Sequence, residues 1–156
     1  MKKFILTLAV SALFLAGCSI DGDDNCVTKT VASEQARMEA MANARGMTWS
    51  QHSTGLLYEI VNAGAGMTAS SSSRIFVKYE GRLENGTIFE TGTDETQTGW
   101  VLGSLILGWQ IAIPLIQEGG KIRVVIPSSL AYGCGSRGNI PSNAILYFEI
   151  ELVDIQ

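Results

Sequence analysis

The chain has 156 residues, which is room for one modest domain and a tail. Its formal net charge of −4 argues against nucleic acid as a partner. The single histidine, His52, lies in a polar stretch, so a metal centre built from histidines is excluded and a nucleophile activated by histidine is disfavoured. We expect chemistry that needs no cofactor, no metal ion and no histidine proton relay.

Residues 1–17 are typical of a secretory signal. Lys2 and Lys3 precede an apolar run over residues 4–15, which is shorter than the roughly 20 residues that a membrane span needs. The run ends in a Leu-Ala-Gly-Cys sequence that resembles the lipobox of bacterial lipoproteins. This resemblance implies cleavage before Cys18 and lipid on the sulfur and amino group of that residue. The alternative is an ordinary signal in which the cysteine stands by chance.

Lipid on Cys18 would anchor the protein in the bacterial cell envelope, with residues 18–29 as a lipidated and solvated tether. We expect the outer membrane, with the domain facing the periplasm. The acidic residues behind the anchor leave exposure on the cell surface as an alternative. An envelope location permits a disulfide between Cys26 and Cys134, and the sequence leaves both the paired and the free state open.

An N-terminal helix is expected over residues 30–45, which are rich in good helix formers and are followed by Gly46 as a stop. Met38 and Met41 contribute to a thin apolar stripe along it. Three arrangements fit this pattern: the helix lies against the domain, stands off the membrane, or forms a dimerisation stem. A linker then leads to residue 54.

Strands are expected where apolar residues alternate with polar ones or form short runs. An Asn-Gly pair at residues 85–86 predicts a tight turn between two of these strands. A loop rich in Gly, Ala and Ser covers residues 62–73. The expected strands are residues 55–61, 74–83, 87–90, 100–103, 121–126 and 145–155.

One short helix is expected among these strands, in the apolar stretch that follows residue 105. Because Pro114 is tolerated only near the first turn, we expect this helix to begin between Trp109 and Ala112. A lone helix among many strands must be what the sheet wraps around. Trp109 would then form the floor of a concavity, and the alternative is that it is an ordinary core residue.

A glycine-rich loop covers residues 130–141. Gly133, Gly135 and Gly138 have the spacing of a dinucleotide fingerprint, but Pro141 follows and no helix opens to receive a phosphate. We therefore expect a mobile loop that overhangs a pocket rather than a nucleotide site.

Eight short motifs, in order along residues 55–155, resemble the FKBP-type peptidyl-prolyl cis-trans isomerases. They are VKYEGRL at 77–83, GTIFE at 86–90, GW at 108–109, GGK at 119–121, IP at 126–127, AYG at 131–133, IP at 140–141 and FEIEL at 148–152. The resemblance implies an α+β fold, a twisted antiparallel β-sheet wrapped around one short α-helix. Residues 55–156 would form the isomerase domain, behind the N-terminal helix.

The resemblance also implies a substrate pocket when the family's site is transferred position by position. In the family a tryptophan lies beneath the prolyl ring between aromatic walls, and the resemblance implies that the Ile106 amide and the Tyr132 hydroxyl would bind substrate or inhibitor carbonyls. The catalytic positions would be Tyr79, Phe89, Glu90, Trp109 and Tyr132, and the substrate-binding positions Leu105, Ile106, Ile140 and Phe148. The implied partners are proline-containing exported polypeptides and macrolide inhibitors.

Two departures from the family pattern bear on activity. Glu90 stands where the family usually has Asp, so its carboxylate is one methylene further from the backbone. The family also has a phenylalanine wall before the central helix that is missing here; its position falls near Thr98, and Trp100 is the candidate substitute. These departures favour the alternative of a proline-peptide-binding chaperone with little turnover. A purely structural lipoprotein is the third possibility.

Overall fold

A computed structural model of the protein describes residues 26–156, and the expected signal and the Cys18 lipidation site lie outside this range. The described residues form one seven-stranded antiparallel sheet of order β1-β2-β6-β7-β3-β4, with β5 pairing to β3. The strands are β1 (Ser50–Gln51), β2 (Leu57–Asn62), β3 (Arg74–Leu83), β4 (Ile88–Gly92), β5 (Trp100–Val101), β6 (Lys121–Ile126) and β7 (Leu146–Ile155).

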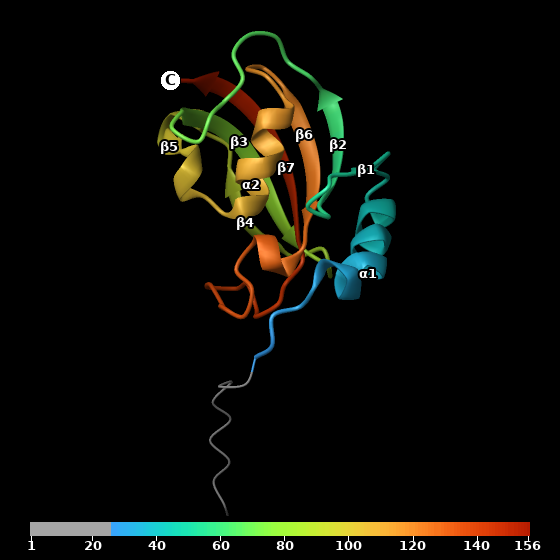
Figure 1. The fold of residues 1–156 in the computed structure, drawn as a ribbon. Coiled ribbons are helices and arrows are strands. Elements are labelled where there is room, and N and C mark those ends of the chain that lie inside the picture. Colours follow the sequence, from blue (N-terminus) through green and yellow to red (C-terminus); the bar gives the residue numbers. More distant parts are fainter. Residues whose placement is uncertain (1–25) are drawn as a thin grey trace, which may run out of the picture.

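The sheet curls around one short helix, α2 (Leu107–Ala112), which is followed by the 3₁₀ helix η3 (Ile113–Leu115) (Figure 1). The expected fold class is thereby confirmed. The alternation predicted for β3 is also confirmed, because Ile75 and Val77 are buried in the core under α2. At Gly108 an added Cβ would collide with the Ile126 side chain, so the missing side chain lets α2 pack closely on β6.

The predicted start of the central helix is wrong by at least two residues. Helix α2 begins at Leu107 and ends at Ala112, two residues before Pro114, which lies in the 3₁₀ turn. Proline has no N–H to donate and disfavours the helical conformation in the residue before it. Here the proline therefore terminates the α-helix rather than starting it.

Helix α1 (Val31–Ala44) covers the opposite face of the sheet (Figure 1). The Thr30 side chain caps it by accepting a hydrogen bond from the Ser33 N–H at 3.2 Å. Met38 and Met41 are buried against Val125 of β6 and its neighbours. Of the three expected arrangements, the structure has the helix lying against the domain.

Two further features bear on expectations from the sequence. The two cysteines in the described range, Cys26 and Cys134, form a disulfide, with their Cα atoms 5.7 Å apart and 108 residues between them in the sequence. The structure therefore decides the question that the sequence left open. Among residues 26–156 no helix combines the length and the apolar character needed to cross a membrane.

Candidate active site

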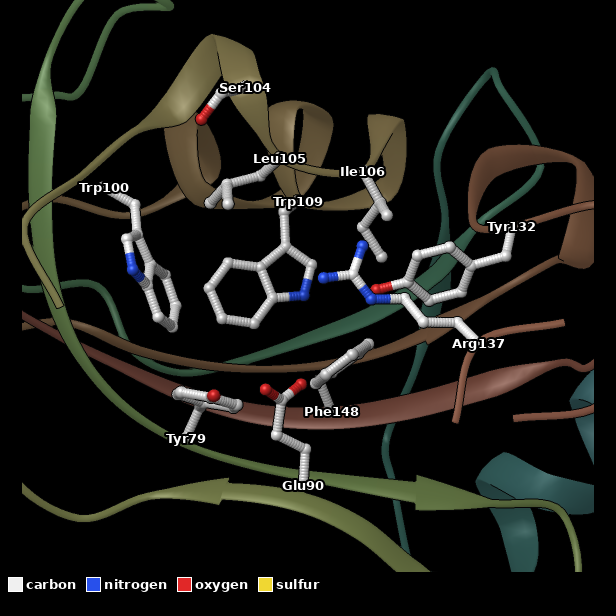
Figure 2. Close-up of a pocket in the computed structure, with 10 residues that line it drawn as sticks. All are labelled: Tyr79, Glu90, Trp100, Ser104, Leu105, Ile106, Trp109, Tyr132, Arg137 and Phe148. Carbon is white, nitrogen blue, oxygen red and sulfur yellow. The ribbon is translucent and has the colours of Figure 1, made fainter. Parts of the chain in front are cut away.

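A pocket of about 320 Å³ opens beside the N-terminal end of α2 (Figure 2). It lies between this helix, the strands β3, β4 and β7, and the loop after β6. Its lining residues are Tyr79, Glu90, Trp100, Ser104, Leu105, Ile106, Trp109, Tyr132, Arg137 and Phe148. Aromatic rings thus supply much of the wall, and the few polar groups converge from different elements.

The floor of the pocket is the indole of Trp109, which is 4% exposed. Its ring meets the Tyr79 and Phe148 rings edge to face, with a centroid distance of 5.3 Å in each pair. Such packing fixes the orientation of the indole, because edge-to-face pairs prefer a defined geometry. The two roles considered for Trp109 are therefore combined, since it belongs to the core and also faces an open pocket.

Trp100 completes the aromatic wall beside Tyr79 and Trp109. Its ring lies 5.7 Å from the Tyr79 ring and 6.3 Å from the Trp109 ring, measured between centroids. Figure 2 shows it standing beside the floor, on the opposite side from Tyr132. The candidate substitute for the missing phenylalanine wall thus lines the pocket.

Two of the nine expected site residues do not line the pocket. Phe89 packs edge to face behind Phe148, at a centroid distance of 5.5 Å, and the space for this pair exists because Gly81 has no Cβ to meet both rings. Ile140 is buried and pairs with Arg137 through two backbone hydrogen bonds of 2.9 Å. Both residues support the residues that form the wall.

The carboxylate of Glu90 lies between the Tyr79 and Phe148 rings, directed toward the floor (Figure 2). The pKa of Tyr79 is raised well above its usual value, first by burial of the hydroxyl and then by the charge of Glu90. Tyr79 therefore remains protonated, and its hydroxyl is a hydrogen-bond donor throughout the physiological pH range.

Hydrogen-bond donors approach the pocket from the other side. Ile106 precedes the first turn of α2, and within the described chain its N–H donates to no backbone carbonyl. Figure 2 shows the Tyr132 hydroxyl directed toward the indole. The indole Nε1 of Trp109 is also buried without a partner among the described residues. A bound peptide carbonyl could accept hydrogen bonds from this side of the pocket.

Sequence reasoning did not identify Ser104 and Arg137 as lining residues. Arg137 lies in the glycine-rich loop, and its guanidinium carbon is 5.4 Å from the centroid of the Tyr132 ring. Only the loop conformation brings it to the pocket, so no local pattern could have revealed it. Within residues 26–156 no group of three His, Cys, Asp or Glu side chains is arranged to hold a metal ion.

A sequence profile described as "FKBP-type peptidyl-prolyl cis-trans isomerase" matches residues 66–153. The chain belongs to this family. It is 33% identical over 142 residues to a probable FKBP-type peptidyl-prolyl cis-trans isomerase of Haemophilus influenzae, an alignment covering 81% of this chain and 59% of the relative. The chain therefore spans about three-fifths of the length of that protein.

Two solved structures resemble the fold of this chain. The crystal structure of FkpA from Escherichia coli superposes with a TM-score of 0.70 at 35% identity, covering 81% of this chain and 59% of FkpA. A peptidyl-prolyl cis-trans isomerase from Pseudomonas syringae gives a TM-score of 0.67 at 32% identity, covering 85% of this chain and 99% of that one. The similarity to the second structure extends over its whole length.

Proposed function

We propose that this FKBP-family protein catalyses the cis-trans isomerisation of X-Pro bonds in exported polypeptides. One observation carries the proposal: an open, aromatic-lined pocket has a buried tryptophan as its floor, and beside it the Ile106 N–H donates to no backbone carbonyl of the described residues. The indole offers a flat, apolar surface, and a prolyl ring is small and apolar enough to lie on it. The Ile106 N–H and the Tyr132 hydroxyl would hold the flanking peptide carbonyls.

The mechanism requires no covalent chemistry. Rotation about an amide bond is opposed by about 18–20 kcal/mol, because conjugation between the carbonyl and the nitrogen is lost. The twisted amide has less charge separation than the planar one. A dry pocket formed by Trp109, Phe148 and Tyr79 therefore disfavours the planar ground state relative to the twisted state, which is differential binding of the transition state.

A protease-coupled assay on proline tetrapeptides tests the proposal. We expect the purified protein to accelerate the cis-to-trans step above its uncatalysed rate, which has a time constant of about 10–100 s. A rate equal to the uncatalysed one would refute the enzymatic proposal. Competition by a macrolide that binds FKBP-type proteins would assign the activity to this pocket.

A second candidate function is a proline-peptide-binding chaperone with little turnover. Glu90 supports it, because the family usually has Asp at this position and the longer side chain places its carboxylate differently beside Tyr79. The two candidates differ in one measurable respect. The chaperone would change its tryptophan fluorescence with proline peptides, yet leave their isomerisation rate unchanged.

We further propose that the protein is anchored in the bacterial cell envelope through lipid on Cys18. The lipobox-like motif supports this location, and so does the Cys26–Cys134 disulfide, since such bonds persist in oxidising compartments. A Cys18→Ala variant should move from the membrane fraction to the soluble fraction of lysed cells. Protease treatment of intact cells would then distinguish a periplasmic orientation from surface exposure.

A further inference from the structure

The N-terminal segment contacts the loop that carries two pocket residues. We call residues 127–141 the Tyr132 loop; it contributes Tyr132 and Arg137 to the pocket. Residues 26–34 precede the part of the chain that matches the family profile, which begins at residue 66. This segment is joined to the loop at two places, one at the middle of the loop and one at its start.

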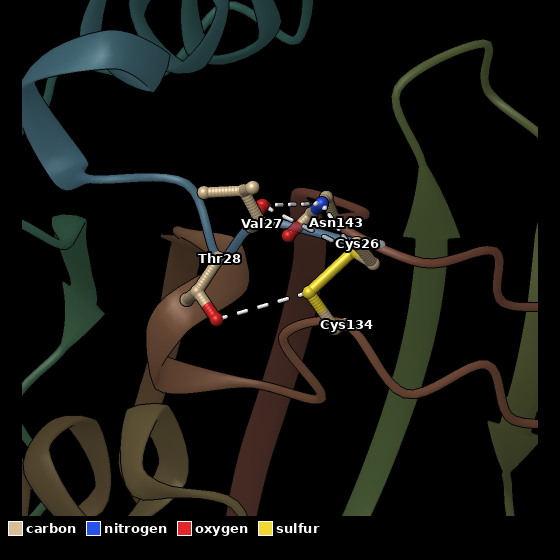
Figure 3. Close-up of a disulfide and its surroundings, with 5 residues drawn as sticks. All are labelled: Cys26, Val27, Thr28, Cys134 and Asn143. Carbon is tan, nitrogen blue, oxygen red and sulfur yellow. Dashed lines mark hydrogen bonds between the residues drawn. A yellow bond between two sulfur atoms is a disulfide. The ribbon is translucent and has the colours of Figure 1, made fainter. Parts of the chain in front are cut away.

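The first contact is the Cys26–Cys134 disulfide (Figure 3). Cys134 lies two residues after Tyr132, so the bond fixes the backbone close to the pocket. Asn143 reinforces this contact, because its side-chain Nδ2 donates to the Val27 carbonyl at 3.1 Å and its backbone N–H donates to the Gly133 carbonyl at 2.7 Å. Three separate segments of the chain therefore meet at this point.

The second contact is the carboxylate of Glu34, which lies in the first turn of α1 and is 1% exposed. Its Oε2 accepts a hydrogen bond from the Ser128 N–H at 2.8 Å, across 94 residues of sequence. The Ser128 carbonyl in turn accepts from the N–H groups of Ala131 and Gly133, at 3.0 and 2.9 Å. Glu34 thus holds the first turn of the Tyr132 loop through a buried hydrogen bond to the Ser128 backbone.

We infer that residues 26–34 act as a brace that positions the Tyr132 loop over the pocket, with Glu34 and the disulfide as its two fixed points. A braced loop is ordered before the substrate arrives, so binding does not have to order it. Glu34 and Cys26 are positioning residues, because neither lines the pocket. The expected effect of the brace on substrate binding rests on the proposed function, whereas its expected effect on the order of the loop does not.

Two kinds of variant remove the fixed points separately. Glu34→Ala removes the acceptor for the Ser128 N–H, whereas Glu34→Gln retains an acceptor oxygen on a side chain of the same length. The double variant Cys26→Ser with Cys134→Ser removes the covalent link. Glu39→Ala is the matched control, since Glu39 lies on the same helix and its carboxylate accepts from Gln35 rather than from the loop.

Hydrogen exchange is the readout that does not depend on activity. We expect the amides of Ala131, Gly133 and Gly135 to exchange faster in Glu34→Ala and in the double cysteine variant, and to be unchanged in Glu39→Ala. Glu34→Gln should restore much of the protection. Unchanged exchange at all three amides in both disruptive variants would overturn the brace, whether or not the protein is an isomerase.

Catalysis supplies the second readout, measured with a proline tetrapeptide in a protease-free assay. We expect KM to rise about three- to tenfold in the disruptive variants, the penalty for ordering one or two side chains on binding, while kcat changes less than twofold. Faster exchange with an unchanged KM would overturn the positioning role. Absence of turnover in the unmodified protein would instead refute the proposed function. The hydrogen-exchange measurement would then be the test of the brace.

Discussion

Replacing Trp109 by leucine tests the part of the pocket on which the proposed function depends. The substitution keeps an apolar side chain but removes the flat indole and its two edge-to-face contacts with Tyr79 and Phe148. Each aromatic pair is worth about 0.5–1.5 kcal/mol, and deletion of a buried tryptophan side chain to alanine costs about 3–5 kcal/mol. Because leucine refills part of the space, we expect a loss of about 2–3 kcal/mol in unfolding free energy.

The effect on catalysis follows from the contact with the prolyl ring. A buried methylene group is worth about 0.8 kcal/mol, so losing the floor beneath about two of them costs about 1.5 kcal/mol. That energy corresponds to roughly a tenfold fall in kcat/KM. The protease-coupled assay measures this fall, and thermal unfolding followed by circular dichroism shows that the variant is folded at the assay temperature.

Trp49→Leu is the matched control for this prediction. Trp49 packs with the cluster under α1, and its Nε1 donates to Asn43 at 3.1 Å, away from the pocket. We expect this variant to lose some stability and to keep its kcat/KM. Full turnover in a folded Trp109→Leu protein would remove Trp109 from the site, and equal losses in both variants would show that the assay reports only global stability.

Three further changes probe single groups. Tyr132→Phe removes one hydroxyl, and we expect kcat/KM to fall about three- to tenfold, the worth of one hydrogen bond; an unchanged value would exclude that bond. Glu90→Asp restores the residue typical of the family and should raise kcat/KM by about two- to tenfold; a decrease would show that this pocket requires the longer side chain. Burial alone would raise the pKa of Glu149, but the hydrogen bonds and charges of Lys121 and Arg123 outweigh it and hold the pKa below its usual 4.5. The stability that this carboxylate contributes is therefore present above pH 4.5 and is lost as the pH falls through the folded-state pKa. In Glu149→Gln the unfolding free energy measured with urea should fall less steeply as the pH is lowered. The same pH dependence in the variant and the unmodified protein would contradict the ion-pair assignment.

Six of the seven described strands and the N-terminal helix could be predicted from the sequence because their signals are local, whereas the two-residue strand β1 lies in the expected linker. Alternation over ten residues defines β3, and the Asn-Gly pair defines the turn that follows it. The polar cap at Thr30 and the stop at Gly46, which has a φ of +62°, bracket α1. The motifs that carry the family resemblance are also short and contiguous in the sequence. For this reason Trp109 could be predicted as the floor of the pocket.

Long-range packing decided the remaining features. Whether α1 lies on the sheet depends on Val125 and its neighbours being buried on the outer face, which a thin stripe of methionines does not reveal. Whether Phe89 faces the pocket or supports Phe148 depends on how β4 and β7 pair with the two edges of β3 at Gly81. The register of such contacts is a property of the folded sheet, not of any segment within it.

By itself the sequence determined the elements, the family and most of the pocket residues, because periodicity, turn chemistry and motif identity are encoded over a few neighbouring positions. Only the tertiary structure decided that Cys26 pairs with Cys134, that Glu34 holds the start of the Tyr132 loop, and that Arg137 reaches the pocket. These contacts join residues that are far apart in the chain or depend on a loop conformation. Their partners are therefore chosen by the geometry of the fold and not by local preference.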